Sequence, residues 1–236
     1  MSSSARARAR RLAWRIRDYW YVGFRQVSGA VSRAGADSYR DPAARRAPTI
    51  VLLPGVYESW TFLRPLAQTL GAHGHPVHVL PTLGYNRGPV PAAAALLGEY
   101  LAGQGLDRVV LVAHSKGGLI GKLAMIRHDP GRRITGMVAV ATPFAGSQYA
   151  RWLPLPAVRA FVPTDRTLVA LAAEREVNAR IVSVYPRFDP HIPAGSALDG
   201  AAANIELDTP GHFRVLADPA LAVTVHDAVH RLEGAR

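Results

Sequence analysis

The sequence predicts an α/β fold in which a mostly parallel sheet is covered by helices on both faces. The first observation is that short apolar segments alternate with segments of helical periodicity from residue 49 onward. The second is that the apolar segments lack polar alternation, which is typical of strands buried on both faces. The third is size, because 236 residues, 49% of them hydrophobic, suffice for one sizeable core.

The elements are expected in alternating order along the chain. The expected strands are short and nearly all apolar, and they are residues 49–53, 76–80, 108–113, 134–141, 180–185 and 205–207. The expected helices carry apolar side chains three or four positions apart, and they are residues 60–72, 92–101, 117–127, 164–176 and 220–232. Residues 143–163 are rich in proline and aromatic side chains and interrupt this order. Because that stretch is short for a separate domain, we expect a small or absent cap over the sheet.

Positive charge is concentrated in the N-terminal segment. The whole chain has a formal net charge of +11, and residues 1–48 hold eleven arginines and three aspartates. The remainder is close to neutral, so the sequence does not predict the basic groove of a nucleic-acid-binding protein. We expect a basic amphipathic segment in residues 1–46, a folded α/β domain in residues 47–236, and no nucleic-acid partner.

The basic segment has the pattern of an amphipathic helix. At 100° per residue its apolar positions fall within an arc of about 140°, and they are Leu12, Ile16, Tyr19, Trp20, Gly23, Phe24, Val27, Ala30 and Val31. Arginines and Asp18 lie on the other side, and Trp14 breaks the pattern. Such a helix either lies on an anionic bilayer, packs on its own protein or forms a frayed basic tail. The sequence leaves these alternatives open, with a mitochondrial transit peptide as a further one.

The location of the protein is predicted from the absence of targeting patterns. The chain has no run of 18 or more apolar residues, so we expect no transmembrane helix. Arg15, Arg17 and Asp18 interrupt the only candidate for the apolar region of a signal peptide. We therefore expect a cytoplasmic protein, peripheral to the membrane if the basic helix binds one. Cysteine is absent, which excludes disulfides, thiolate metal sites and cysteine nucleophiles.

The candidate nucleophile is Ser115. It stands where the apolar strand 108–113 gives way directly to a helix, with Ala113 two residues before it and Gly117 two residues after it. A serine on such a sharp turn has a strained backbone, so its neighbours must be small, and its hydroxyl points off the carboxyl edge of the sheet. The nearby helix N-terminus favours negative charge there. The sequence therefore predicts a nucleophile elbow at Ser115.

Two backbone N–H groups are candidates for an oxyanion hole. The segment Pro54-Gly-Val-Tyr57 follows the first strand, and its glycine allows a turn that aims the Val56 N–H at the site. The Lys116 N–H comes directly after the nucleophile. We expect these two donors to stabilise negative charge on a substrate oxygen.

The serine needs a general base, and His212 is the candidate among nine histidines. It lies after the last strand and before the last helix, in a loop that reaches the carboxyl edge of the sheet. His114 adjoins the serine, but we expect it to point away from the hydroxyl. His226 and His230 lie on the last helix and are interpreted as surface or packing residues.

The candidate acid that orients the base is Asp189, which follows the strand 180–185 and precedes His212 in the chain. Asp208 is the substitute, four residues before the histidine. His191 lies two residues after Asp189, so it raises either a metal pair or a different base as alternatives. Because no further ligands cluster around it in the sequence, we expect no metal and no cofactor.

These motifs together resemble those of α/β-hydrolase-fold lipases and esterases, particularly small bacterial lipases with almost no cap. The resemblance covers residues 49–233 and rests on four motifs in order, which are Leu53-Pro-Gly-Val-Tyr57, Ala113-His-Ser-Lys-Gly-Gly118, Asp189 with Ile192-Pro193, and Gly211-His-Phe-Arg-Val-Leu216. The chain has Pro54 where the family usually has histidine, and Ala113 replaces the first glycine of the serine motif. Residues 1–48 match no motif of the family.

The expected function is hydrolysis of a carboxylic ester through an acyl-enzyme, with Ser115, His212 and Asp189 as the triad. The substrate is expected to be a small-molecule or lipid ester. An acyl pocket is one interpretation of the apolar side chains after the fourth strand, and core or lid packing is the other, the residues being Trp152, Leu153, Leu155, Val158, Phe161 and Val162. A thioesterase or acyltransferase uses the same triad. A catalytically silent hydrolase-fold protein held at a membrane is the alternative from another class.

Overall fold

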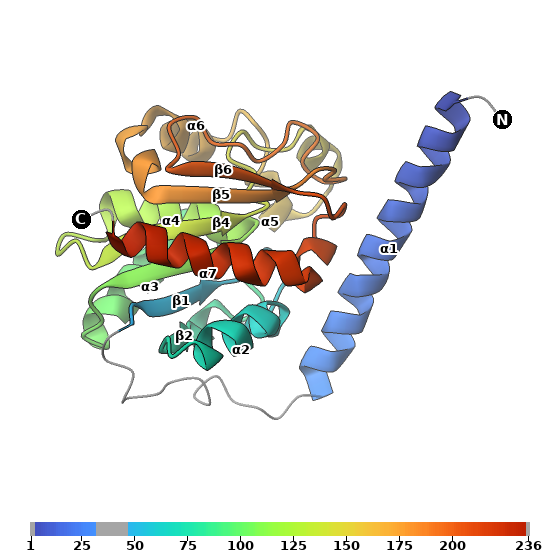
Figure 1. Ribbon diagram of the computed structural model, residues 1–236. Helices are drawn as coiled ribbons and strands as arrows, with labels where there is room; N and C mark the ends of the chain where they lie inside the picture. The colour runs from blue at the N-terminus through green and yellow to red at the C-terminus, as the bar shows by residue number, and fades with distance from the viewer. Residues whose placement is uncertain (1–2, 32–46, 235–236) are drawn as a thin grey trace.

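The computed structural model describes residues 3–31 and 47–234, with the side chains of 3–5, 7, 24, 25 and 27–31 left undescribed (Figure 1). Six parallel strands form one sheet in the order β2-β1-β3-β4-β5-β6. The strands are β1 (Thr49–Leu53), β2 (Val77–Val79), β3 (Val109–His114), β4 (Ile134–Val140), β5 (Ile181–Pro186) and β6 (Ala203–Leu207). Each of the six strands predicted from the sequence is therefore present.

Helices cover both faces of the sheet. The helices α2 (Arg64–Ala72) and α7 (Pro219–Gly234) lie on one face, while α3 (Val90–Gly103), α4 (Lys116–Arg127) and α6 (Arg166–Ala173) lie on the other (Figure 1). The central strands are buried on both faces, and β3 has no exposed residue. This explains why these strands are apolar throughout, and it confirms the predicted α/β class.

Two predicted helices begin or end differently in the structure. Residues 60–72 start with a 3₁₀ turn, η2 (Trp60–Leu63), before α2 begins with Pro65 in its first turn. Within residues 164–176, α6 begins after Asp165, which caps it by accepting hydrogen bonds from Thr167 N and Leu168 N. The helix ends at Ala173, and the 3₁₀ segment η5 (Glu176–Arg180) follows. These differences concern element ends, which local periodicity fixes poorly.

The segment between β4 and α6 is a small cap, as predicted. It contains only the 3₁₀ turn η4 (Gln148–Trp152) and the short helix α5 (Pro156–Arg159). Between β6 and α7, a further 3₁₀ turn, η6 (Arg214–Ala217), follows His212.

The N-terminal helix α1 (Ser3–Val31) lies beside the body at the carboxyl edge of the sheet (Figure 1). Its packed side includes Trp14, whose ring lies 5.3 Å from that of Phe188, and Asp18, which is fully buried. The sequence pattern put both residues outside the apolar arc, and the structure places them on the side of α1 that packs against the body. The seam uses positions four residues apart, because i and i+4 share a helix face.

Three residues of the predicted apolar arc of α1 face away from the body. Leu12, Ile16 and Trp20 are 59%, 51% and 77% exposed. No helix within the described residues is long and apolar enough to cross a membrane. The predicted boundary between residues 46 and 47 borders residues 32–46, which lie outside the described part of the chain.

Candidate active site

Ser115 occupies a sharp turn between β3 and α4. Its backbone has φ 51° and ψ −118°, a left-handed conformation that is costly for a residue with a side chain. The neighbouring glycines make the turn possible, because a Cβ at Gly117 would lie 2.2 Å from the Leu53 carbonyl oxygen. A Cβ at Gly118 would lie 2.0 Å from Thr142 Oγ1. The strain and the close packing are those expected of a nucleophile elbow.

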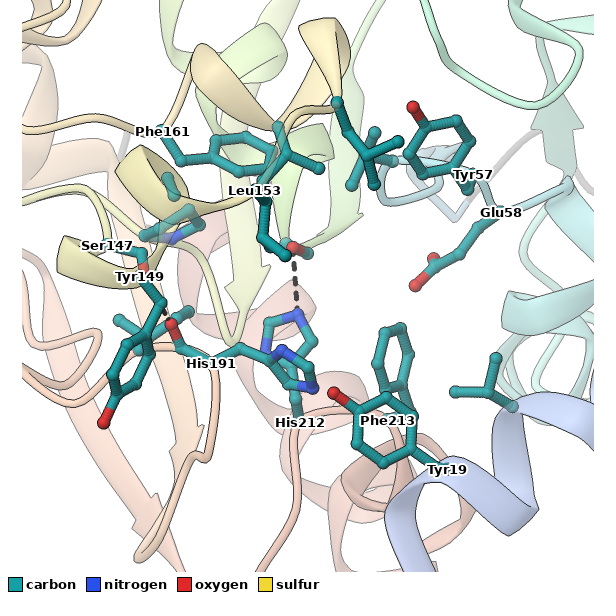
Figure 2. A pocket seen from close by; sticks show the side chains of 18 of the residues that line it. Tyr19, Tyr57, Glu58, Ser147, Tyr149, Leu153, Phe161, His191, His212 and Phe213 are labelled. Carbon is teal, nitrogen blue, oxygen red and sulfur yellow. Dashed lines mark hydrogen bonds between the residues drawn. The ribbon is translucent and has the colours of Figure 1, made fainter. Parts of the chain in front are cut away.

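The structure brings Ser115, His212 and Asp189 into one hydrogen-bonded chain. His212 Nε2 lies 3.0 Å from Ser115 Oγ, the bond drawn as a dashed line in Figure 2, and His212 Nδ1 lies 2.7 Å from Asp189 Oδ2. The other carboxylate oxygen of Asp189 accepts hydrogen bonds from the His191 and Ile192 backbone N–H groups. Asp189 is therefore held at both oxygens, which fixes the plane in which it meets the imidazole.

The negative charge of Asp189 and the positive charge of a protonated His212 stabilise each other. Burial disfavours the ionised Asp189, but the positive charge and hydrogen bond of His212 outweigh it and lower the pKa of Asp189. Burial also disfavours a charged His212, while the charge and hydrogen bond of Asp189, with smaller contributions from Asp18 and Glu58, raise the pKa of His212. The imidazole is thus made more basic than in water.

Asp18 of α1 contacts the histidine loop directly, and the sequence analysis missed it. Its carboxylate accepts hydrogen bonds from the backbone N–H groups of His212, Phe213 and Arg214, at 3.1, 2.8 and 2.9 Å. Burial raises the pKa of Asp18 although these hydrogen bonds oppose the shift. Asp18 therefore fixes the backbone of the loop that carries His212.

Glu58 and His114 form a second buried connection that the sequence did not predict. His114 Nδ1 lies 2.8 Å from Glu58 Oε1, and His114 Nε2 lies 3.0 Å from the His212 carbonyl oxygen. The Gly55 N–H donates to Glu58 Oε2 over 2.7 Å. His114 thus has its hydrogen-bond partners away from the Ser115 hydroxyl, as expected. The network ties the loop after β1 to the loop that carries His212.

The two predicted oxyanion donors belong to the loop after β1 and to the start of α4. Val56 lines the same cavity as Ser115, and Lys116 is the first residue of α4, where a backbone N–H has no acceptor within the helix. The Lys116 side chain is buried and donates to the carbonyl oxygens of Asn86 and Gly88. Burial lowers the pKa of Lys116 to about 8. Asn86 in turn donates to Pro54 O over 2.7 Å, which supports the turn before Val56.

A cavity of about 290 Å³ opens at Ser115 and His212 (Figure 2). Four of the six side chains proposed for an acyl pocket line it, namely Leu153, Leu155, Val158 and Phe161. The other two do not, because Trp152 is 76% exposed and Val162 lines a different hollow beside Pro89. Tyr149 and Ile192 contribute further apolar surface. The cavity is therefore suited to an aliphatic or aromatic group.

The helix α1 also forms part of the cavity wall. Tyr19, Val22 and Gln26 line it, and Gln26 Nε2 donates to the Tyr57 carbonyl oxygen over 3.0 Å. Figure 2 shows Tyr19 approaching Phe213 and His212 from this helix. The sequence analysis predicted residues 1–46 to be separate from the site. No local pattern in these residues indicates that α1 contacts the cavity.

The side chains of the alternative site residues lie outside the chain of hydrogen bonds from Ser115 to Asp189. Asp208 is exposed and pairs with Arg187. The His191 ring lies beside that of His212, 5.1 Å between centroids, and burial lowers the His191 pKa to about 4. Within the described residues, His191 belongs to no group of three potential metal ligands.

Comparisons with known proteins agree on the fold. No family model and no curated protein matches this chain. A lipase from Bacillus licheniformis in its mature form superposes with a TM-score of 0.60 and 16% identity, covering 80% of this chain and 94% of the lipase. An extracellular α/β-hydrolase from Paenibacillus has a TM-score of 0.54 and 16% identity, with 77% and 98% covered. An α/β-hydrolase-fold protein from Burkholderia ambifaria has a TM-score of 0.56 and 20% identity, with 77% and 91% covered.

The chain has the α/β-hydrolase fold, as the resemblance in the sequence implied. The small cap agrees with the 94% coverage of the lipase chain.

Proposed function

We propose that the protein is a serine hydrolase that cleaves carboxylic esters through an acyl-enzyme. The observation that carries this proposal is the chain from Ser115 Oγ through His212 to Asp189, which opens onto an apolar cavity. No step requires a cofactor. A structural neighbour, the protein from Bacillus licheniformis, is a lipase, which supports the proposal.

The reaction has two halves. In the first, Ser115 Oγ attacks the ester carbonyl carbon while His212 Nε2 takes its proton, and His212 then gives that proton to the departing alcohol. In the second, His212 takes a proton from water, the hydroxide attacks the acyl carbon, and Ser115 recovers its proton as the carboxylic acid leaves. Asp189 stabilises the imidazolium in both halves. The N–H groups of Val56 and Lys116 donate to the oxyanion.

The substrate class follows from the lining of the cavity. Leu153, Leu155, Val158 and Phe161 offer apolar contacts to an acyl chain or an apolar alcohol. We propose a lipid or aliphatic ester on this ground. The test is a series of p-nitrophenyl esters of increasing acyl length, with kcat/KM expected to rise from acetate to longer chains. A maximum at acetate contradicts the lipid assignment. Parallel assays with acyl thioesters and acceptor alcohols address the thioesterase and acyltransferase alternatives.

We also propose that α1 places the protein peripherally on an anionic membrane. The specific observation is that its packed seam, around Asp18, differs from its apolar arc, so Leu12, Ile16 and Trp20 remain exposed. Arginines flank this arc, and they attract anionic headgroups. Because α1 also borders the cavity, a bound membrane would lie near the entrance used by a lipid ester.

Replacing Ile16 and Trp20 by serine is expected to weaken binding to phosphatidylglycerol vesicles by roughly thirtyfold for each residue, since burying such a side chain contributes about 2 kcal/mol. The measurement is cosedimentation at low and high salt, and wild-type binding should fall with salt. Val223→Ser, which alters an exposed apolar residue of α7, is the control that keeps wild-type binding. Binding indifferent to salt and lipid charge contradicts the proposal. Point substitutions are sharper than truncation, because truncation also removes Asp18.

The pH dependence of kcat/KM tests the role of Asp18 as a positioning residue. Activity is expected to rise with pH through the His212 pKa, which is raised above 6.5, because only the neutral imidazole accepts the Ser115 proton. Asp18→Asn removes a charge that raises this pKa, so the inflection should move to lower pH. Asp165→Asn is the matched control, since Asp165 accepts two backbone hydrogen bonds elsewhere. An unmoved inflection in Asp18→Asn would limit Asp18 to a structural role.

A further inference from the structure

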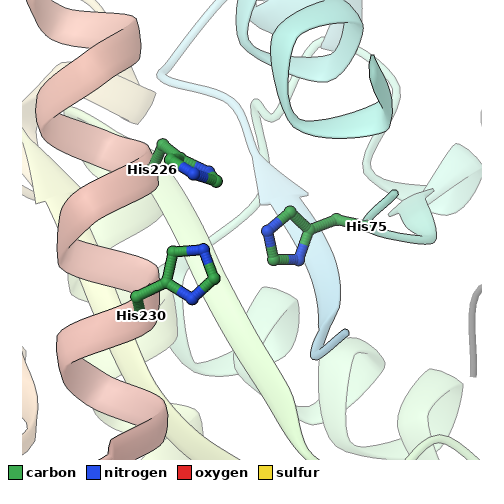
Figure 3. Close-up of side chains that lie close together, drawn as sticks. All are labelled: His75, His226 and His230. Carbon is green, nitrogen blue, oxygen red and sulfur yellow. The ribbon is translucent and has the colours of Figure 1, made fainter. Parts of the chain in front are cut away.

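Three histidines outside the active site converge on the face of the sheet covered by α2 and α7. His226 and His230 are four residues apart on α7, so they share one side of that helix. His75 lies opposite them, in the connection between α2 and β2 (Figure 3). One nitrogen from each ring lies within 4.8 Å of the others. The sequence analysis interpreted the α7 histidines as surface or packing residues.

The hydrogen bonds of this cluster leave ring nitrogens free. His75 Nδ1 lies 3.0 Å from the Pro48 carbonyl oxygen, which only accepts, so Nδ1 carries the proton and Nε2 keeps its lone pair. His75 Nε2 and His226 Nδ1 are both buried without a hydrogen-bond partner among the described residues. A ligand histidine usually donates its other N–H to a carbonyl, which is the arrangement of His75.

The charge state of the cluster also suits a cation. Burial, with contributions from neighbouring imidazoles, lowers the pKa of His75 and of His226. Burial therefore disfavours the protonated form of both rings, and the neutral form is the one that binds metal. Glu233 adds negative charge near His75.

We propose that His75, His226 and His230 form a binding site for a divalent transition-metal ion, with Zn²⁺ as the ion that the donor set fits best. Imidazole nitrogen is a preferred zinc ligand, and Zn–N bonds of 2.0–2.1 Å in a tetrahedral site place ligand nitrogens about 3.3 Å apart. The three ligand nitrogens now lie within 4.8 Å of one another, and the exposed His230 can turn to bring its ring closer. Water fills the fourth position.

The site is structural rather than part of the hydrolytic centre. His75 precedes β2 at the amino edge of the sheet, whereas Ser115 follows β3 at the carboxyl edge, and the strands are parallel. A bound ion joins α7 to the segments that lead into β1 and β2, because His75 also holds Pro48. An ion that binds only the folded state stabilises it in proportion to the logarithm of its concentration.

The test uses the full-length protein, free of any purification tag and treated with chelator. Isothermal titration with ZnCl₂ is expected to show one equivalent bound at micromolar or lower Kd, with a Tm that rises with zinc. His230→Gln should reduce the affinity for zinc by more than tenfold. Removing even a group that only hydrogen-bonds to a ligand typically costs about 10- to 100-fold in metal affinity. His75→Asn should reduce the affinity similarly, because it removes a ligand imidazole. The asparagine amide still donates to the Pro48 carbonyl oxygen, so the variant should keep the fold. His128→Gln is the control that keeps wild-type affinity.

Two results overturn the proposal. One is the absence of zinc binding at micromolar concentrations by the wild-type protein. The other is equal affinity in the wild-type protein and His230→Gln, which would assign the binding to other groups. If His75→Asn fails to fold by circular dichroism, the exposed His230 variant decides alone. Fluorophosphonate labelling, measured with and without zinc, separates this outcome from the proposed hydrolase activity, because labelling should be independent of the ion.

Discussion

Replacing Ser115 by alanine is expected to reduce ester turnover by on the order of 10⁶-fold. The variant lacks the attacking Oγ atom, and the other triad members act only together with it. The fold should persist, because the Ser115 side chain makes no capping hydrogen bond to α4. Its backbone conformation is also equally accessible to alanine. The measurements are kcat on a soluble p-nitrophenyl ester, covalent labelling by a fluorophosphonate, and the Tm.

The labelling result is decisive for the nucleophile. Wild-type protein should incorporate one fluorophosphonate per chain, and Ser115→Ala should incorporate none. Ser59→Ala, which alters a serine at the start of η2, is the control that retains labelling and turnover. Undiminished labelling of Ser115→Ala would show that Ser115 is not the nucleophile. A wild-type protein that neither labels nor hydrolyses any ester in the series would favour a silent hydrolase-fold protein instead.

The second large effect is expected from the base and its acid. His212→Ala and Asp189→Asn should each reduce turnover by on the order of 10³-fold or more, because the serine loses its proton acceptor or the imidazole loses the group that orients it. The pH profile of Asp189→Asn should also move to lower pH, since the charge of Asp189 raises the pKa of His212.

Two neighbouring residues provide matched controls for these variants. His191→Ala removes a ring beside His212, yet only the backbone N–H of His191 bonds to Asp189, so the effect should be far smaller. Asp208→Asn alters an exposed carboxylate paired with Arg187 and should leave turnover near that of the wild type. The triad assignment is wrong if His191→Ala abolishes ester turnover while His212→Ala remains active.

Prediction from the sequence succeeded where the determinants are local. Strand β3 is recognisable because it is buried on both faces and therefore apolar throughout, and the turn at Ser115 because its steric demand falls on Ala113 and Gly117 nearby. The order of the candidate residues along the parallel sheet then placed Asp189 and His212 at its carboxyl edge. Parallel strands bring distant segments to one edge by rule, so this much of the site follows from pattern alone.

The supporting groups could not be predicted, because their partners are distant in the chain. Asp18 meets the His212 N–H across 194 positions, and Glu58 meets His114 across 56. In the sequence, Asp18 is one acid in an arginine-rich helix, and nothing local distinguishes it from a solvated charge. The convergence of His75 with His226 is hidden for the same reason.

By itself, the sequence determined the α/β class, the order of strands and helices, the strained serine and the two residues that join it. Only the tertiary structure decided which side of α1 packs, which apolar side chains line the cavity and which histidine meets the pair on α7. The physical reason is that periodicity states which residues share a face of an element but not what that face meets. For α1 the helical pattern defined an apolar arc, and packing against the histidine loop selected the side of Asp18 instead, because three backbone N–H groups there required an acceptor.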